Sequence, residues 1–81
     1  MAKYEVKDDV GIIPEWATEI EDEAFKYCKE LKSISIPPTV TEIGDCAFSG
    51  CSSLTTVKVS KNTEIAYNAF YGCPNVKIER Y

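Results

Sequence analysis

Histidine is absent from this chain, and methionine and tryptophan occur once each. Histidine is the side chain most often used for proton transfer near neutral pH and is the commonest metal ligand. The sequence also lacks a Gly-x-Ser-x-Gly motif, and its four glycines form no phosphate-binding loop. We therefore expect that the protein is not an enzyme and that it binds no cofactor and no metal ion.

Positive charge is also scarce, since 13 Asp and Glu outnumber 9 Lys and Arg and leave a net charge of −4. Nucleic acids and anionic membranes are bound through basic patches, so we expect neither as a partner. No apolar run is long enough to cross a bilayer, which predicts no membrane insertion. No basic segment followed by an apolar one comes after Met1, so we expect no signal peptide in these residues.

The sequence contains three segments that repeat one another. Cys51 follows Cys28 by 23 residues, and Cys73 follows Cys51 by 22. Each cysteine belongs to a block that reads Ile-x3-Ala-Phe-x2-Cys-x2-Leu or Val, followed by alternating apolar positions. A period near 23 is typical of leucine-rich-repeat solenoids, whose units are about 20–29 residues long. The blocks begin at Ile20, Ile43 and Ile65.

Each repeat predicts one strand and one short helical turn. Residues 31–36 alternate apolar and polar side chains, as a half-buried strand does, and Pro37 ends that strand. In residues 20–28 the apolar positions share one face of a helix. Polar residues one or two positions before each Ala-Phe pair are expected to cap these helical turns, namely Asp22, Asp45 and Asn68.

These blocks resemble the BspA-like leucine-rich repeat, also called the Treponema pallidum type. The resemblance rests on the blocks that start at Ile20 and Ile43, on the Ile36-Pro37 strand exit and on the Val40-x2-Ile43 link. It implies an α/β solenoid, a right-handed leucine-rich-repeat coil with a short parallel β-sheet on the concave side and short helical turns on the convex side. It also implies a bacterial surface or secreted protein, often an adhesin.

We expect a single leucine-rich-repeat domain over residues 1–81, with about three repeats of 22–23 residues. Tyr4 and Val6 alternate in a way that predicts an N-terminal strand or cap, and Asp8-Asp9 is expected to form a turn. The third repeat departs from the pattern, because Asn62-Thr63 replaces three residues. The expected parts are an N-terminal cap and partial repeat (1–19), repeats at 20–42 and 43–64, and a C-terminal partial repeat (65–81).

The cysteines allow more than one interpretation. The equivalent residues Cys28, Cys51 and Cys73 are expected to form a row inside the core, where unpaired cysteines act as small apolar side chains. Stacked parallel side chains fit disulfide geometry poorly, and a linear row without histidine does not supply a zinc site. Cys46 aligns with polar residues and is expected to face solvent, either as a plain surface thiol or as a source of intermolecular disulfides.

Acidic residues gather at Glu19, Glu21, Asp22 and Glu23. A charge run of this kind is usually a solvated face, and Ile20 and Ala24 account for the opposite side. Calcium binding is the alternative, but the Asp-x-Asp-x-Asp-Gly pattern of a calcium loop is absent.

The solenoid architecture favours binding to an unknown protein partner through an open, repeated surface. The outward positions of the sheet are small or charged and include no aromatic anchor. Trp16 is expected to pack over the open N-terminal coil, with exposure to a partner as the alternative. Exposed aromatic side chains are expected on the helical side at Tyr27, Tyr67 and Tyr71. The candidate binding residues of the sheet are Ser33, Ser35, Thr56, Lys58, Lys77 and Glu79.

The last strand lacks an evident polar cap, and exposed strand edges promote association. Three explanations remain: the chain is cut from a longer array, the last residues cover their own end, or the edge pairs with another copy as a homodimer. The candidate self-association edge consists of Ile78, Glu79, Arg80 and Tyr81. We predict a non-catalytic protein-interaction module that adheres to a host or matrix protein; the alternative is an excised or engineered scaffold with no partner of its own.

Overall fold

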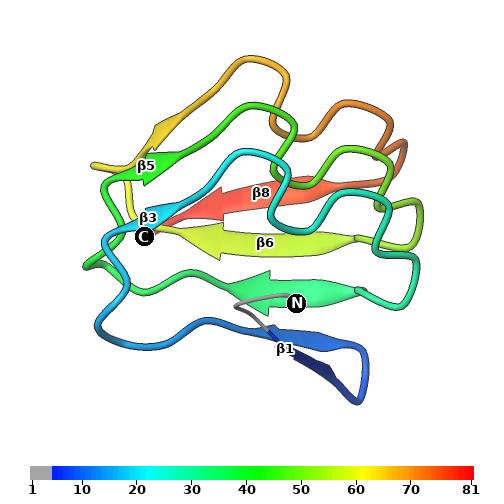
Figure 1. The fold of residues 1–81 in the computed structure, drawn as a ribbon, viewed down its shortest axis with the longest axis horizontal. Helices are drawn as coiled ribbons and strands as arrows, with labels where there is room; N and C mark the ends of the chain where they lie inside the picture. The colour runs from blue at the N-terminus through cyan, green and yellow to red at the C-terminus, as the bar shows by residue number, and fades with distance from the viewer. Residues whose placement is uncertain (1–4) are drawn as a thin grey trace.

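The computed structural model describes residues 5–81, which coil into a β-solenoid of stacked turns (Figure 1). Eight short strands form two sheets. The larger sheet has the order β1-β2-β4-β6-β8 and the smaller one the order β3-β5-β7. The strands of the larger sheet are β1 (Glu5–Lys7), β2 (Val10–Ile12), β4 (Ser33–Ser35), β6 (Thr56–Val59) and β8 (Lys77–Arg80). Those of the smaller sheet are β3 (Glu19–Ile20), β5 (Glu42–Ile43) and β7 (Glu64–Ile65).

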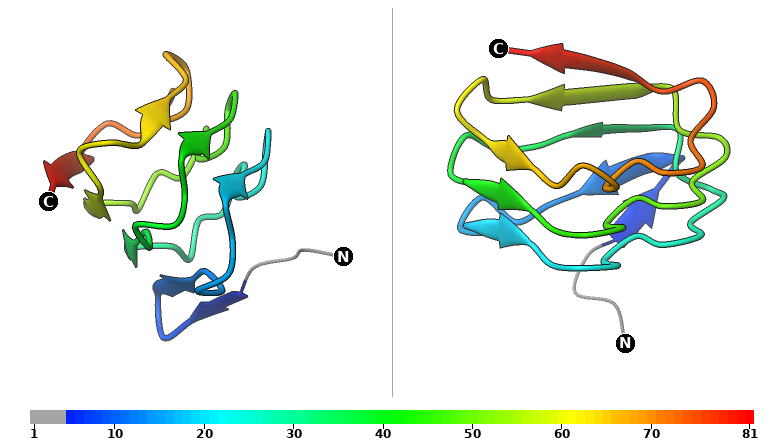
Figure 2. Two further views of the ribbon diagram at one scale, coloured as in Figure 1. Left: turned by 90° about the vertical axis from the view of Figure 1, so that its left-hand side faces the viewer. Right: turned by 90° about the horizontal axis from the view of Figure 1, so that it is seen from above.

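Parallel pairing joins the coils, as the alternating repeats predict. β2, β4, β6 and β8 pair in parallel, with Ile34 opposite Val57 and Val57 opposite Ile78. The coil interior separates the two sheets, so each coil crosses from one sheet to the other and back (Figure 2). The solenoid architecture implied by the sequence is therefore confirmed.

An antiparallel hairpin begins the larger sheet. β1 pairs with β2 in the opposite direction, with Val6 opposite Gly11. The two residues between the strands, Asp8 and Asp9, have φ angles of 52° and 70°. Positive φ at both positions matches the tight hairpin turn that suits the twist of paired strands. Tyr4, which the sequence places in the same strand, lies outside the described residues.

The core consists of side-chain rows that run from coil to coil. The rings of Phe25 and Phe48 stack with centroids 5.1 Å apart, and those of Phe48 and Phe70 with centroids 5.0 Å apart. These distances are close to the strand spacing of about 4.8 Å, so the rings repeat with the coils. Phe48, in the central coil, is fully buried. The other fully or almost fully buried members of the rows are Ile20, Ile43, Leu31 and Leu54.

The prediction of short helical turns is wrong, because no residue from 5 to 81 is helical. In the second coil the N–H groups alternate between two kinds of partner. Cys51 donates within its own turn to Phe48 O, whereas Phe48 donates to Ala69 O and Gly50 to Tyr71 O in the next coil, each at 2.8 Å. A helix would use all these groups internally. Some residues of the turns also have positive φ, which right-handed helices exclude, and in the first two turns they are four positions apart: Glu23 and Tyr27, Cys46 and Gly50, and Gly72 in the third.

Candidate functional site: the sheet face and the open end

The outer surface of the larger sheet, here called the sheet face, brings the six candidate binding residues together. Their positions follow from the parallel register, because side chains two residues apart point to the same side of a strand. Ser33, Thr56 and Lys77 form one row across β4, β6 and β8. The second row consists of Ser35, Lys58 and Glu79, all exposed.

Two apolar residues extend the sheet face at its N-terminal side. Val10 lies opposite Ser33, and Ile12 projects to the same side two residues later. Their exposed fractions are 43% and 42%. The sequence analysis did not include them, although the alternation about the buried Gly11 is the signal that would have placed them there. The sheet face therefore changes from apolar at β2, through hydroxyl groups at β4, to charged at β8.

The opposite end of the same sheet exposes residues that are core elsewhere. Ile78 occupies the inward position of β8, yet it is 39% exposed, whereas Ile34 and Val57 at the equivalent positions are 2% and 0% exposed. We call this region the open end. It is a shallow, mostly apolar groove lined by Ile65, Ala66, Tyr67, Asn68, Phe70, Tyr71 and Ile78.

Arg80 and Tyr81 close a different part of this end. Arg80 lies opposite Val59, at a position that is aliphatic in the preceding coils, and its Nη1 donates to Ser60 O and Thr63 O, both at 2.8 Å. The Tyr81 hydroxyl donates to the carbonyl of Ile36. The accepting carbonyl groups follow β4 and β6 and precede β7. The sequence predicts four residues at the self-association edge. Arg80 and Tyr81 form hydrogen bonds within their own chain, and Ile78 and Glu79 are exposed.

The turns at residues 22–27, 45–50 and 67–72 lie opposite the sheet face and are here called the turn side; exposed aromatic side chains lie on it. Tyr27, Tyr67 and Tyr71 are all exposed, as the sequence predicts.

Trp16 is 79% exposed, so the prediction that it packs over the N-terminal coil is wrong. The physical reason is local, because Ala17, the next residue in the same turn, takes the inward position and is buried.

Of the three cysteines predicted to form a row inside the core, Cys51 and Cys73 are buried, whereas Cys28 is only partly buried. The Cys51 thiol donates to Phe25 O and the Cys73 thiol to Phe48 O, each at 3.0 Å, so both reach back to the preceding coil. Burial raises the pKa of Cys51 to about 12 and also raises the pKa of Cys28 and of Cys73. All four cysteines are free thiols, and Cys46 is partly buried rather than fully open to solvent. Burial and raised pKa values make the core thiols poor nucleophiles.

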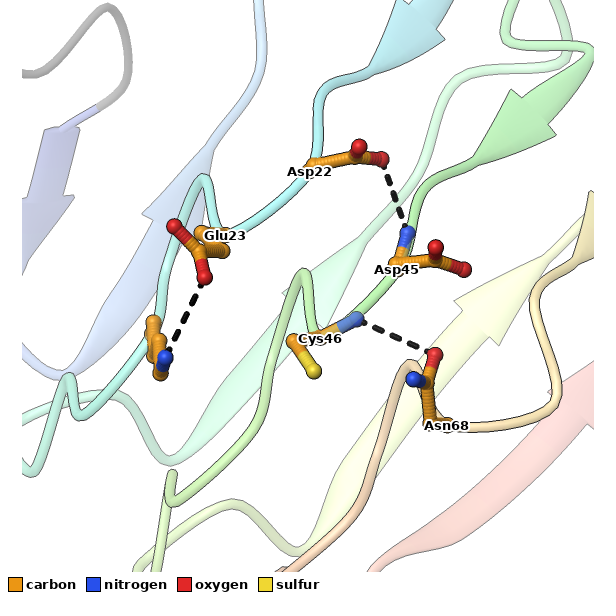
Figure 3. A network of polar contacts seen from close by, with 6 residues as sticks. Asp22, Glu23, Asp45, Cys46 and Asn68 are labelled. Atoms are coloured by element: carbon orange, nitrogen blue, oxygen red, sulfur yellow. Dashed lines mark hydrogen bonds and ion pairs between the residues drawn. The ribbon is translucent and has the colours of Figure 1, made fainter.

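Polar side chains near the turns bond between coils and do not cap helices. Asp22 Oδ1 accepts from Asp45 N at 2.9 Å, and Asn68 Oδ1 accepts from Cys46 N at 3.3 Å (Figure 3). The carboxylate of Asp22 also explains Gly44, because a Cβ atom there would lie 2.2 Å from Asp22 Oδ1. These contacts tie three successive coils together on the turn side.

Acidic side chains align on the smaller sheet. Glu19, Glu42 and Glu64 are in register across β3, β5 and β7, and all are exposed. The predicted solvated acidic face is therefore longer than the local run at residues 19–23. Within residues 5–81 no group of acidic or cysteine side chains is arranged to hold a metal ion.

Comparison with known proteins gives one match. The model of the BspA type leucine rich repeat region matches residues 11–79 in six copies. Neither the curated proteins nor the solved structures contain a match to this chain. Over the described residues, no helix has the length and apolar character needed to span a membrane.

Proposed function

This chain belongs to the BspA-type leucine-rich repeat family, and we propose that it is a non-catalytic module that binds a protein through the sheet face. The observation that carries the proposal is the pair of in-register rows on β4, β6 and β8, continued by the exposed Val10 and Ile12. Leucine-rich repeats commonly bind proteins, and stacked coils present an extended surface suited to that role.

The composition of the sheet face indicates how a partner is held. Val10 and Ile12 supply adjacent apolar surface that a partner side chain can cover. The hydroxyl groups of the central rows supply hydrogen-bond donors and acceptors, and Lys58, Lys77 and Glu79 supply charges. Because burying apolar surface is the main driving force of most protein association, we expect affinity to depend most on Val10 and Ile12, which lie beside the polar rows.

We further propose that the partner is a host or extracellular-matrix protein and that the full protein is secreted or displayed on a cell surface. The family resemblance supports this, since such repeats are typical of surface and secreted proteins. The alternative is that the repeat serves as a scaffold with no partner. A binding experiment decides between the two.

Binding of the folded chain to a panel of purified extracellular-matrix proteins, measured by biolayer interferometry, tests the proposal. We expect Ile12→Asp and Lys58→Glu to weaken binding about tenfold or more, which corresponds to about 1.4 kcal/mol. Lys29→Glu on the turn side makes the same charge change as Lys58→Glu and is expected to have no effect. Equal losses for the two lysine variants would contradict a role for the sheet face. The scaffold alternative would be supported if no panel protein bound.

A further inference from the structure

We propose that two copies of this chain associate by pairing β8 with β8 of a second copy in an antiparallel arrangement, with the two-fold axis at Ile78. This closed dimer joins the open ends of the two solenoids and leaves both sheet faces accessible. Its evidence is separate from that for the binding function, and the two proposals can fail independently. Three features of β8 support it: the direction of its free backbone groups, its exposed apolar residues and its charges.

The backbone of β8 offers hydrogen bonds at the required positions. Lys77 N donates to Thr55 O and Tyr81 N donates to Val59 O, each at 2.9 Å. Backbone groups alternate in direction along a strand, so the N–H and C=O of Ile78 and Arg80 face the outer edge. Ile78 is therefore able to exchange two hydrogen bonds with Ile78 of a second copy, as residues do at a hydrogen-bonded antiparallel pair.

The apolar side chains of the open end favour the same arrangement. Ile78 is 39% exposed, and the adjoining groove includes Ile65 and Phe70, which are only partly buried. Their equivalents in the central coil, Ile43 and Phe48, are almost fully buried because another coil covers them. A second copy at β8 would give Ile78 a neighbour of the same kind across the two-fold axis. Removing this apolar surface from water supplies the driving force.

The charges of β8 select the antiparallel two-fold register. Centring the pair at Ile78 places Lys77 opposite Glu79 of the second copy, and Glu79 opposite its Lys77. These are the closely spaced positions next to a hydrogen-bonded pair, where Cα atoms are about 4.5 Å apart. Opposite charges directly across an antiparallel pair are stabilising, and this register provides two such pairs.

The same charges disfavour an open chain of copies stacked end to end. There, β8 would meet β1 of the next copy, and β1 runs antiparallel to the rest of its sheet. With Ile78 opposite Val6, Lys77 would face Lys7 and Glu79 would face Glu5. Like charges directly opposite are destabilising, so the closed dimer is favoured over a fibre.

Charge reversal at β8 tests the proposal by sedimentation equilibrium of the 81-residue chain, from about 10 to 500 µM. We expect the wild-type mass to rise from one to two copies across this range. Lys77→Glu places acidic residues at both positions 77 and 79, and Glu79→Lys places basic residues at both, so each variant alone is expected to stay monomeric. An equimolar mixture of the two variants is expected to form a heterodimer, because each strand again meets opposite charges.

The opposite edge of the sheet provides the matched control. Lys7→Glu and Glu5→Lys make the same charge changes on β1 and are expected to leave the wild-type association unchanged. All four side chains are exposed, and circular dichroism confirms that each variant is folded before its mass is measured. A wild-type protein that stays monomeric throughout the range overturns the dimer. A wild-type dimer with a variant mixture that stays monomeric overturns the register.

Discussion

The two ends of the solenoid are built from the same repeat, but they differ in how far their inward side chains are covered. At the N-terminal end the inward position of β2 is Gly11, which is buried and lies close to Leu31 and Ile34. At the C-terminal end the equivalent position is Ile78, which is exposed. The aromatic row shows the same contrast, because Phe25 is 4% exposed whereas Phe70 is only partly buried.

This contrast shows that capping a solenoid has two separable parts. The hairpin reverses the chain at the first edge, and the inward apolar residues of the first coil, Ile13, Ala17 and Ile20, are buried. Arg80 and Tyr81 complete the polar part at the last coil by donating to carbonyl groups of Ser60, Thr63 and Ile36. They do not cover the apolar side chains of the last coil, and the groove around Phe70 and Ile78 remains open.

The largest expected effect comes from truncating the aromatic row. Phe48→Ala is expected to lower the free energy of unfolding by about 3–5 kcal/mol, because it empties a buried position between two stacked rings. Phe25→Ala at the closed end is expected to cost nearly as much, and Phe70→Ala at the open end about 1–2 kcal/mol, since partly exposed rings lose less. Urea unfolding measures all three. Equal losses for Phe25 and Phe70 would remove the distinction between the ends, and a loss under about 1 kcal/mol for Phe48 would show that the row is not core.

A smaller effect is expected from filling the inward position of the first strand pair. A Cβ atom at Gly11 would lie 2.7 Å from Ile34 Cδ1 and 2.9 Å from Leu31 Cδ1, so Gly11→Ala is expected to destabilise by about 1–3 kcal/mol through overpacking. The matched change at the open end, Ile78→Ala, is expected to cost less than about 1 kcal/mol because that side chain is partly solvated. Thermal unfolding at low protein concentration compares them. A neutral Gly11→Ala would mean that the closed end is loosely packed.

The smallest effect at neutral pH concerns the buried thiol of Cys51. Burial raises its folded-state pKa to about 12, above the pKa of about 8.5 expected in the unfolded chain. The neutral thiol therefore stabilises the folded state fully below the pKa of the unfolded chain. This contribution to the free energy of unfolding is lost as the pH rises from about 9 toward 12. The free energy of unfolding is therefore expected to fall more steeply above pH 9 for the wild type than for Cys51→Ala. Parallel pH profiles of the two proteins would contradict this.

The rows and strands of the fold were predictable from the sequence because they depend on positions that recur in every coil. Ile34 and Val57 face inward, and Ser35 and Lys58 face outward, as their alternation indicates. The core position of the Phe25, Phe48 and Phe70 row followed from the period alone. The candidate residues of the sheet face were placed on one surface by the same reasoning, although their binding role remains a proposal.

The turn side was not predictable in this way, because its geometry depends on neighbours in the next coil. The Ala-Phe-x2-Cys spacing fits one face of a helix. Phe48 and Gly50 instead donate their backbone hydrogen bonds to the following coil, which prevents the helical pattern. Trp16 was misplaced because its turn offers only one inward position, which Ala17 fills. Arg80 was recognisable in principle, since it aligns with the buried Ile36 and Val59.

The alternating hydrogen bonds of the turn side also bear on how such a chain can change in length. In the first two turns, alternate backbone N–H groups donate to the coil that follows, so inserting a single residue there would break the register of both coils. The one-residue deletion in the third repeat avoids the turns, since it falls between Thr63 and Glu64, directly before the short strand β7. Insertions and deletions that preserve the fold should therefore add or remove whole coils. Single-residue insertions and deletions should occur in the segment before β7.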